Sequence, residues 1–208
     1  MNAQPVLQLY YAPTSPYIRK VMAVAHVTGL VSRIECLESA AHPVQRDARI
    51  ATFNPLGKIP AARTAAGEPL YDSRVICEYL DSLGQGKLFP TGERRWASLT
   101  RQALGDGMLD AAMLARYEGL VRHPKLQSEA WYKAQLEKIH AALDEIERQA
   151  DILEALPLEI GTLTLGCALG YLDFRFPELD WRRDHPQAER WFAKFDHQPA
   201  MAATRPHV

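Results

Sequence analysis

A strand, a helix and a second strand follow one another at the start of the chain, and this order limits the fold more than any other feature. Residues 6–11, VLQLYY, form a short apolar run that is typical of a buried strand. Residues 16–29 carry apolar side chains at helical spacing, and residues 33–38 alternate apolar and polar, with Cys36 expected on the buried face. A strand–helix–strand unit of about thirty residues predicts two parallel neighbouring strands.

The rest of the first ~80 residues predicts a hairpin and a helix. Residues 61–66 and 68–71 read as two short strands around a turn at Gly67. Asp72 and Ser73 then precede the amphipathic run VICEYLDSL, where an Asp or Ser is the expected helix cap. The N-terminal part is therefore expected to be βαβ, an irregular segment, and ββα.

Beyond the Gly- and Pro-containing link at residues 85–92, the pattern becomes purely helical. Apolar positions recur at steps of three and four through residues 136–153, which predicts a long amphipathic helix. Residues 163–174, LTLGCALGYLDF, are apolar on nearly every side, as in a helix buried all round. A last helix is expected at about residues 186–195.

Composition and charge exclude several classes of function. Among 208 residues, 47% are hydrophobic and 24% charged, and the net charge is −1, so nothing favours nucleic acid or an anionic membrane. No apolar run reaches the ~20 residues of a membrane span, and the first residues lack a signal-peptide pattern. The three cysteines are far apart, without a CxxC or Cys/His cluster. We therefore expect reduced thiols, no metal, no membrane and a cytoplasmic location.

Four motifs occur in a characteristic order: YYAPTSPYIRKV, NPLGKIPA, YDSRVICEYLD and ALGYLDFR. In this order and at these separations the chain resembles the glutathione S-transferase family, and most closely its bacterial serine-type members whose first helix opens with Ser-Pro-Phe or Ser-Pro-Tyr. The resemblance implies the glutathione transferase fold, α/β followed by all-α. Residues 1–84 would form a thioredoxin-like, glutathione-binding domain, and residues 92–208 an all-helical C-terminal domain.

Ser15 is the first candidate for catalysis. It stands just before Pro16, where a hydroxyl and the positive end of a helix would both stabilise a thiolate. Three interpretations stay open: Ser15 as the hydroxyl that activates the thiol, Thr14 in that role as in some serine-type relatives, or backbone amides without a dominant side chain. A serine that only caps the helix is the simpler structural explanation.

The resemblance assigns the glutathione-binding residues to two further segments. It implies a cis peptide bond between Ile59 and Pro60. The Ile59 backbone N–H and C=O would then face outward and pair with the cysteinyl unit of glutathione, as one β-strand pairs with another. Lys58 would reach the glycyl carboxylate. Ser73 would hold the γ-glutamyl α-carboxylate, and Asp72, where most relatives have Glu, would take the α-ammonium. A plain loop and a plain helix cap are the alternatives.

The pocket for the second substrate is less clearly encoded. Tyr17, Met108, Arg116 and Tyr117 are candidates to line it, although each is also a plausible core or surface residue.

One further departure concerns the start of the buried helix. Relatives begin it with Ser/Thr-x-x-Asp, whereas this chain has Glu159 and Thr162 with the acid and hydroxyl exchanged. Either Glu159 and Thr162 still cap the helix reciprocally with the two residue types exchanged, or the cap of this helix is weaker than in the relatives.

The function that the resemblance implies is that of a glutathione S-transferase. Such an enzyme presents the glutathione thiolate to small apolar electrophiles, typically as a cytoplasmic homodimer in detoxification. Two alternatives stay open. One is a non-catalytic binding or regulatory protein on the same scaffold. The other is a glutathione-dependent peroxidase, dehalogenase or isomerase. Serine in place of cysteine before Pro16 argues against thiol–disulfide exchange, because serine forms no mixed disulfide.

Overall fold

The computed structural model describes residues 5–207. The first four residues and Val208, which the expected domain ranges include, lie outside the described part. The chain divides into two compact units. One contains the chain up to Phe89 together with the segment from Ala203 onward, and the other is Pro90–Ala202. The division falls in the predicted link, and the last residues group with the first unit.

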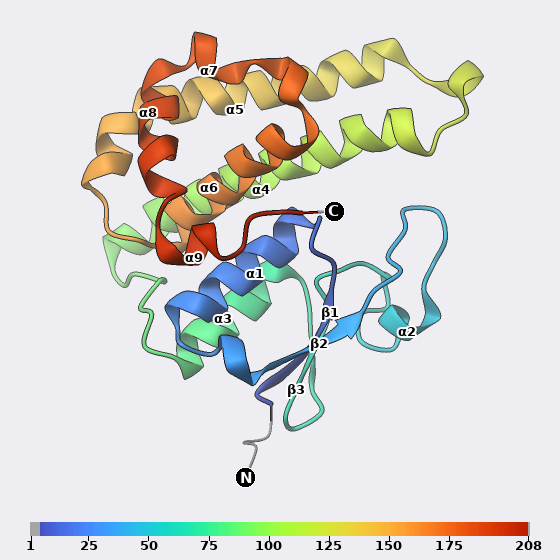
Figure 1. The fold of residues 1–208 in the computed structure, drawn as a ribbon, viewed down its shortest axis with the longest axis vertical. Coiled ribbons are helices and arrows are strands. Elements are labelled where there is room, and N and C mark those ends of the chain that lie inside the picture. The colour runs from blue at the N-terminus through green and yellow to red at the C-terminus, as the bar shows by residue number, and fades with distance from the viewer. Residues whose placement is uncertain (1–4, 208) are drawn as a thin grey trace. The chain divides into compact units, whose positions relative to one another are not determined.

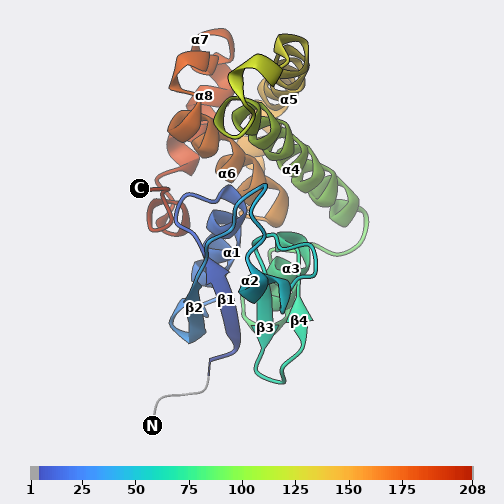
Figure 2. The ribbon, with the colours of Figure 1, turned by 90° about the vertical axis from the view of Figure 1, so that its right-hand side faces the viewer.

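The first unit is a four-stranded mixed sheet with helices on both faces. The strand order is β2-β1-β3-β4, seen from left to right in Figure 2. As predicted, β1 and β2 are parallel. Strand β3 is antiparallel to both β1 and β4. Its elements are β1 (Leu7–Tyr11), α1 (Pro16–Val27), a 3-10 turn (Val31–Arg33), β2 (Ile34–Glu38), α2 (Ala48–Ala51), β3 (Ala62–Thr64), β4 (Pro69–Leu70) and α3 (Ser73–Leu83).

The helices cover the sheet unequally. Figure 1 shows α1 and α3 on one side of the sheet and α2 on the other. On the α2 side, Tyr10, Ile50 and Phe53 form a small buried cluster, in which the Tyr10 and Phe53 rings meet edge to face at 4.9 Å. Leu7 and Leu9, which alternate with Tyr10 along β1, are fully buried on the opposite face. Burial on both faces explains why β1 reads as a continuous apolar run.

The expectation that Cys36 is buried is wrong. Cys36 is exposed, whereas Leu37, the next residue, packs against the Tyr10 cluster. The reason is the strand order: β2 lies at the edge of the sheet, so its outer side has no neighbouring strand. The alternation of apolar and polar residues therefore identified the strand correctly, but it did not predict which side chains of the strand are buried.

This exposure predicts selective thiol chemistry. Because Cys77 and Cys167 are fully buried, a small disulfide reagent should titrate one thiol per native chain, and all three thiols after denaturation. Partial burial raises the pKa of the Cys36 thiol, so labelling should be slow at neutral pH and accelerate as the pH rises. Cys36→Ser should leave no reactive thiol in the native protein; persistent labelling of that variant would contradict the assignment.

The second unit is entirely helical, as predicted. The three segments expected to be helical, at residues 136–153, 163–174 and 186–195, all lie in helices, and the shorter turns between them were not foreseen. Its elements are α4 (Glu93–Leu120), a 3-10 turn (Pro124–Leu126), α5 (Glu129–Ala155), α6 (Ile160–Arg175), a 3-10 turn (Pro177–Leu179), α7 (Trp181–Asp184), α8 (Pro186–Phe195) and α9 (Pro199–Ala202).

Helix α6 forms the centre of this unit. Every residue from Ile160 to Leu172 is buried, which confirms the prediction of a helix buried all round. Among residues 5–207, no helix combines the length and apolar character needed to cross a membrane. At its start, Glu159 and Thr162 form a capping box in which the Thr162 hydroxyl accepts from the Glu159 N–H at 3.1 Å. The exchanged residue types therefore still make a reciprocal cap.

Candidate functional site

The register of the sheet brings three segments of the first unit to the same end of the sheet, the end at which β1 finishes. Strand β1 ends at Tyr11 and continues into the turn that starts α1. The Tyr10 N–H donates to the Ala61 carbonyl at 3.0 Å, so the residues just before Ala61 run beside the end of β1. Leu70 of β4 lies opposite Ala62 of β3, so β4 leads into the start of α3 at the same end of the sheet. The segments that contain Ser15, Ile59–Pro60 and Asp72–Ser73 thus converge there.

Ser15 is the N-cap of α1. Its backbone is extended, with φ −84° and ψ 122°, and its Oγ accepts from the Ile18 N–H at 3.3 Å. The side chain is half-buried at the start of the helix, with Pro16 in the first turn. A hydroxyl that accepts one hydrogen bond keeps its own proton available for donation. Capping and thiol activation are therefore compatible at this residue.

The loop before β3 is shaped by a residue that the motif analysis did not single out. Asn54 is buried at 2% exposure; its side-chain amide donates to the Lys58 carbonyl at 2.9 Å, and its oxygen accepts from the Leu56 N–H at 3.0 Å. The Ile59–Pro60 peptide bond is cis, as the resemblance implied. The Asn-Pro pair in the sequence was the available signal, because Asn side chains commonly organise turns.

Lys58 itself is exposed, and Ile59 is partly buried against the cluster around Tyr10. The roles of Lys58 and of the Ile59 backbone in binding glutathione stay predictions.

Asp72 and Ser73 form the start of α3. Asp72 is the N-cap: its Oδ1 accepts from the Arg74 N–H at 2.9 Å, and its Oδ2 pairs with the Arg74 guanidinium at 2.9 Å. Ser73 is buried at 3% exposure. Burial acts to raise the pKa of the Asp72 carboxyl, but the hydrogen bonds from the Arg74 side chain and backbone outweigh it, and the pKa lies below its ordinary value. A ligand ammonium would therefore share this carboxylate with Arg74.

This pairing predicts how stability depends on pH. Because the folded-state pKa is lowered, the charged Asp72 stabilises the fold above the unfolded pKa of about 4, and this contribution disappears as pH falls through the lower folded pKa. Asp72→Asn keeps a capping side chain but removes the charge. Urea denaturation should show a constant deficit in the variant above about pH 5 that shrinks below about pH 4. A deficit independent of pH would exclude the charge as its cause.

The candidates for the second substrate lie in both units. Tyr17 is a half-buried residue in the first turn of α1. Met108, Arg116 and Tyr117 all lie on α4: Met108 is buried, while Arg116 and Tyr117 are adjacent, half-buried residues about two turns further on. Arg116 and Tyr117 lie next to each other because they are consecutive in the sequence.

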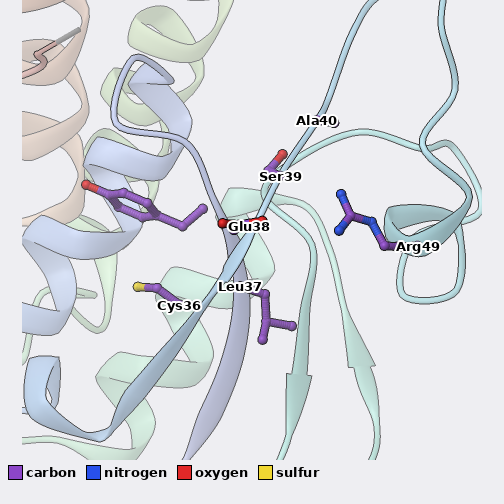
Figure 3. Close-up of a pocket in the computed structure, with 7 residues that line it drawn as sticks. Cys36, Leu37, Glu38, Ser39, Ala40 and Arg49 are labelled. Atoms are coloured by element: carbon purple, nitrogen blue, oxygen red, sulfur yellow. The ribbon is translucent and has the colours of Figure 1, made fainter.

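A cavity of about 380 Å³ lies along β2, and no predicted site residue lines it. Its walls include Tyr11, Cys36, Glu38 and Arg49. Figure 3 shows Cys36 and Leu37 on opposite sides of the strand, with Arg49 on the side away from Cys36. Arg49 is held by Asp47 at 3.1 Å. Within residues 5–207, no group of three or more His, Cys, Asp or Glu side chains could hold a metal ion.

Comparison with known proteins agrees with the fold and the motifs. The description "Glutathione S-transferase, N-terminal domain" matches residues 14–83, and "Glutathione S-transferase, C-terminal domain" matches residues 129–194. A glutathione transferase family member from Pseudomonas fluorescens Pf-5, solved with bound glutathione, is 46% identical with a TM-score of 0.94, over 97% of this chain and 100% of that one. The chain belongs to the glutathione S-transferase family.

Two more relatives extend the comparison. A glutathione S-transferase from Methylobacillus flagellatus KT, solved with glutathione bound, is 33% identical with a TM-score of 0.88, over 97% of this chain and 100% of that one. The uncharacterized GST-like protein YibF of Escherichia coli K12 is 29% identical over 96% of this chain and 98% of its own length. The expected family and fold are therefore confirmed.

Proposed function

We propose that the protein is a glutathione transferase that binds glutathione at the end of the sheet where Ser15, Ile59–Pro60 and Asp72–Ser73 lie. The observation that carries this proposal is the convergence of the three segments on the N-terminus of α1. Relatives of 46% and 33% identity were solved with glutathione bound, which supports glutathione as the co-substrate here.

The proposed chemistry is activation of a nucleophile. A free thiol has a pKa of about 8.5 and is mostly protonated at neutral pH, whereas the thiolate is the attacking form. The Ser15 hydroxyl donates a hydrogen bond to the glutathione sulfur, and the N-terminus of α1 adds its positive dipole end. Lowering the thiol pKa by about two units corresponds to about 2.7 kcal/mol, which one charge-assisted hydrogen bond and a helix terminus supply together. The thiolate then attacks a small apolar electrophile held close by.

Two measurements test this function. The protein should be retained on immobilised glutathione and eluted by free glutathione. It should also conjugate glutathione to 1-chloro-2,4-dinitrobenzene: a carbon–sulfur bond forms, chloride leaves, and the thiol proton passes to the buffer. Retention without turnover would favour a binding protein on this scaffold. Failure to bind glutathione would overturn both functions.

The proposal extends to the setting of the enzyme: a cytoplasmic homodimer that detoxifies electrophiles. Among residues 5–207, no cysteine forms a disulfide, which fits a reducing compartment. Trp96 on α4 is 66% exposed, and an exposed aromatic side chain of this size suits an interface between subunits. Light scattering coupled to gel filtration should give twice the chain mass, and Trp96→Glu should shift the protein towards the monomer. A wild-type monomer would refute the homodimer.

A further inference from the structure

Helices α4 and α6 of the second unit pack along each other (Figure 1). Two arginines and two tyrosines lie on the sides by which these helices meet. On α4, Met113, Arg116 and Tyr117 are spaced i, i+3 and i+4, which places them on one face. On α6, Tyr171 and Arg175 are spaced i and i+4, again on one face. The Tyr171 hydroxyl donates to the Met113 sulfur at 2.9 Å, so these two faces meet.

Neither arginine of this cluster has an acidic partner. Among residues 5–207, neither the Arg116 nor the Arg175 guanidinium forms an ion pair, whereas Arg122, two residues beyond the end of α4, pairs with Glu118 at 2.8 Å. The acid nearest to Arg175 along α6 is Asp173, whose carboxylate is already held by Arg182. The cluster is therefore positively charged, with no carboxylate of its own.

Arg175 is the less well satisfied of the two arginines. Its Nε is buried and makes no hydrogen bond within the described chain, and Phe174 covers the guanidinium at 4.0 Å from the ring centre. Desolvation and then the charge of Arg116 lower the pKa of Arg175, and burial raises the pKa of Tyr171 to about 12. Arg175 stays charged and Tyr171 stays protonated at neutral pH. A position at the C-terminus of α6 favours a cation at Arg175, but it does not explain the second cation at Arg116.

We propose that Arg116 and Arg175, with the hydroxyl of Tyr117, bind a carboxylate carried by the electrophilic substrate. Guanidinium groups are well suited to carboxylates, since they offer several directed N–H donors and a charge, and the Tyr117 hydroxyl adds a neutral donor. The Tyr171 hydroxyl, which donates to Met113, helps to hold α4 and α6 together at this point. The inference rests on the transferase function proposed above and narrows its substrates to apolar electrophiles that bear an anionic group.

A matched pair of electrophiles tests the specificity. 1-Chloro-2,4-dinitrobenzene is neutral, and 4-chloro-3,5-dinitrobenzoate carries a carboxylate; both react by loss of chloride as described above. We expect the ratio of kcat/KM for the anionic over the neutral substrate to fall at least about tenfold in Arg116→Met and in Arg175→Met, the loss typical of a charged hydrogen bond. Arg122→Met, which removes a charge just beyond the end of α4 and outside the cluster, should keep the wild-type ratio. Equal ratios in all four proteins would overturn the carboxylate site.

Direct binding separates this site from the transferase function. 4-Nitrobenzoate has no leaving group, and calorimetry of the intact protein should show binding that both Met variants weaken at least about tenfold and Arg122→Met does not. Should neither chloroarene react while this pattern holds, the transferase function fails and the anion site stands. Binding that ignores both arginines refutes the site. Arg175→Lys, which keeps the charge without the planar fork, should give an intermediate loss and serves where a Met variant does not fold.

Discussion

Ser15→Ala should lower the rate of glutathione conjugation roughly 10- to 100-fold at neutral pH, while the affinity for glutathione changes much less. The reason is the position of the Ser15 hydroxyl at the N-cap of α1, where its oxygen accepts from Ile18 and its proton is available to a sulfur atom. Without that proton donor the pKa of the bound thiol rises towards about 8.5, and the thiolate population falls. The pH–rate profile of kcat should shift to higher pH accordingly, so the variant approaches wild type in alkaline buffer.

A control is needed because the same hydroxyl also caps the helix. Alanine at an N-cap costs about 1 kcal/mol of stability, whereas glycine costs only a few tenths. Ser15→Gly should therefore lose as much activity as Ser15→Ala while remaining closer to wild type in urea denaturation. Thr14→Val tests the neighbouring hydroxyl. If Thr14→Val abolishes turnover and Ser15→Ala does not, Thr14 is the activating group. If neither substitution changes turnover, the backbone amides activate the thiol.

Gly161→Ala should destabilise the helical unit by roughly 2 to 3 kcal/mol, the range expected for overpacking a tight contact. A Cβ at Gly161 would lie 2.6 Å from the Ser98 backbone oxygen and 2.9 Å from the Arg101 Cβ, closer than side chains approach. The Gly161 N–H also donates to the Ser98 hydroxyl at 3.3 Å, so α4 and α6 would lose both packing and a hydrogen bond as they separate. The midpoint of urea denaturation measures the loss.

Gly107→Ala provides the opposite case. Nothing lies within 4 Å of a Cβ added at Gly107, which is exposed within α4. Alanine there should stabilise the protein by up to about 1 kcal/mol, because glycine has the greater backbone entropy in the unfolded chain. The two substitutions should therefore shift the denaturation midpoint in opposite directions. If both substitutions shift the midpoint in the same direction, the close approach of α4 and α6 is not the reason for glycine at position 161.

Much of the fold follows from local chemistry in the sequence. The cap at Ser15 with Pro16 after it, the cap at Asp72, and the helix through the apolar run 163–174 are encoded by residues close together in the sequence, so they could be predicted without a structure. The fourth case was partly open: Glu159 and Thr162 allowed a reciprocal or a weaker cap, and the structure has the reciprocal one.

Features that depend on distant parts of the chain could not be predicted in this way. Cys36 alternates like a buried residue, but its exposure follows from the edge position of β2, which only the order of all four strands determines.

The candidate site divides in the same manner. Sequence alone determined which motifs carry Ser15, the Ile59–Pro60 turn and Asp72, because their caps and turns are encoded locally. Only the tertiary structure decided that Arg175 of α6 joins Arg116 of α4. The physical reason is that burial and charge depend on every group within a few ångströms, whatever its separation along the chain.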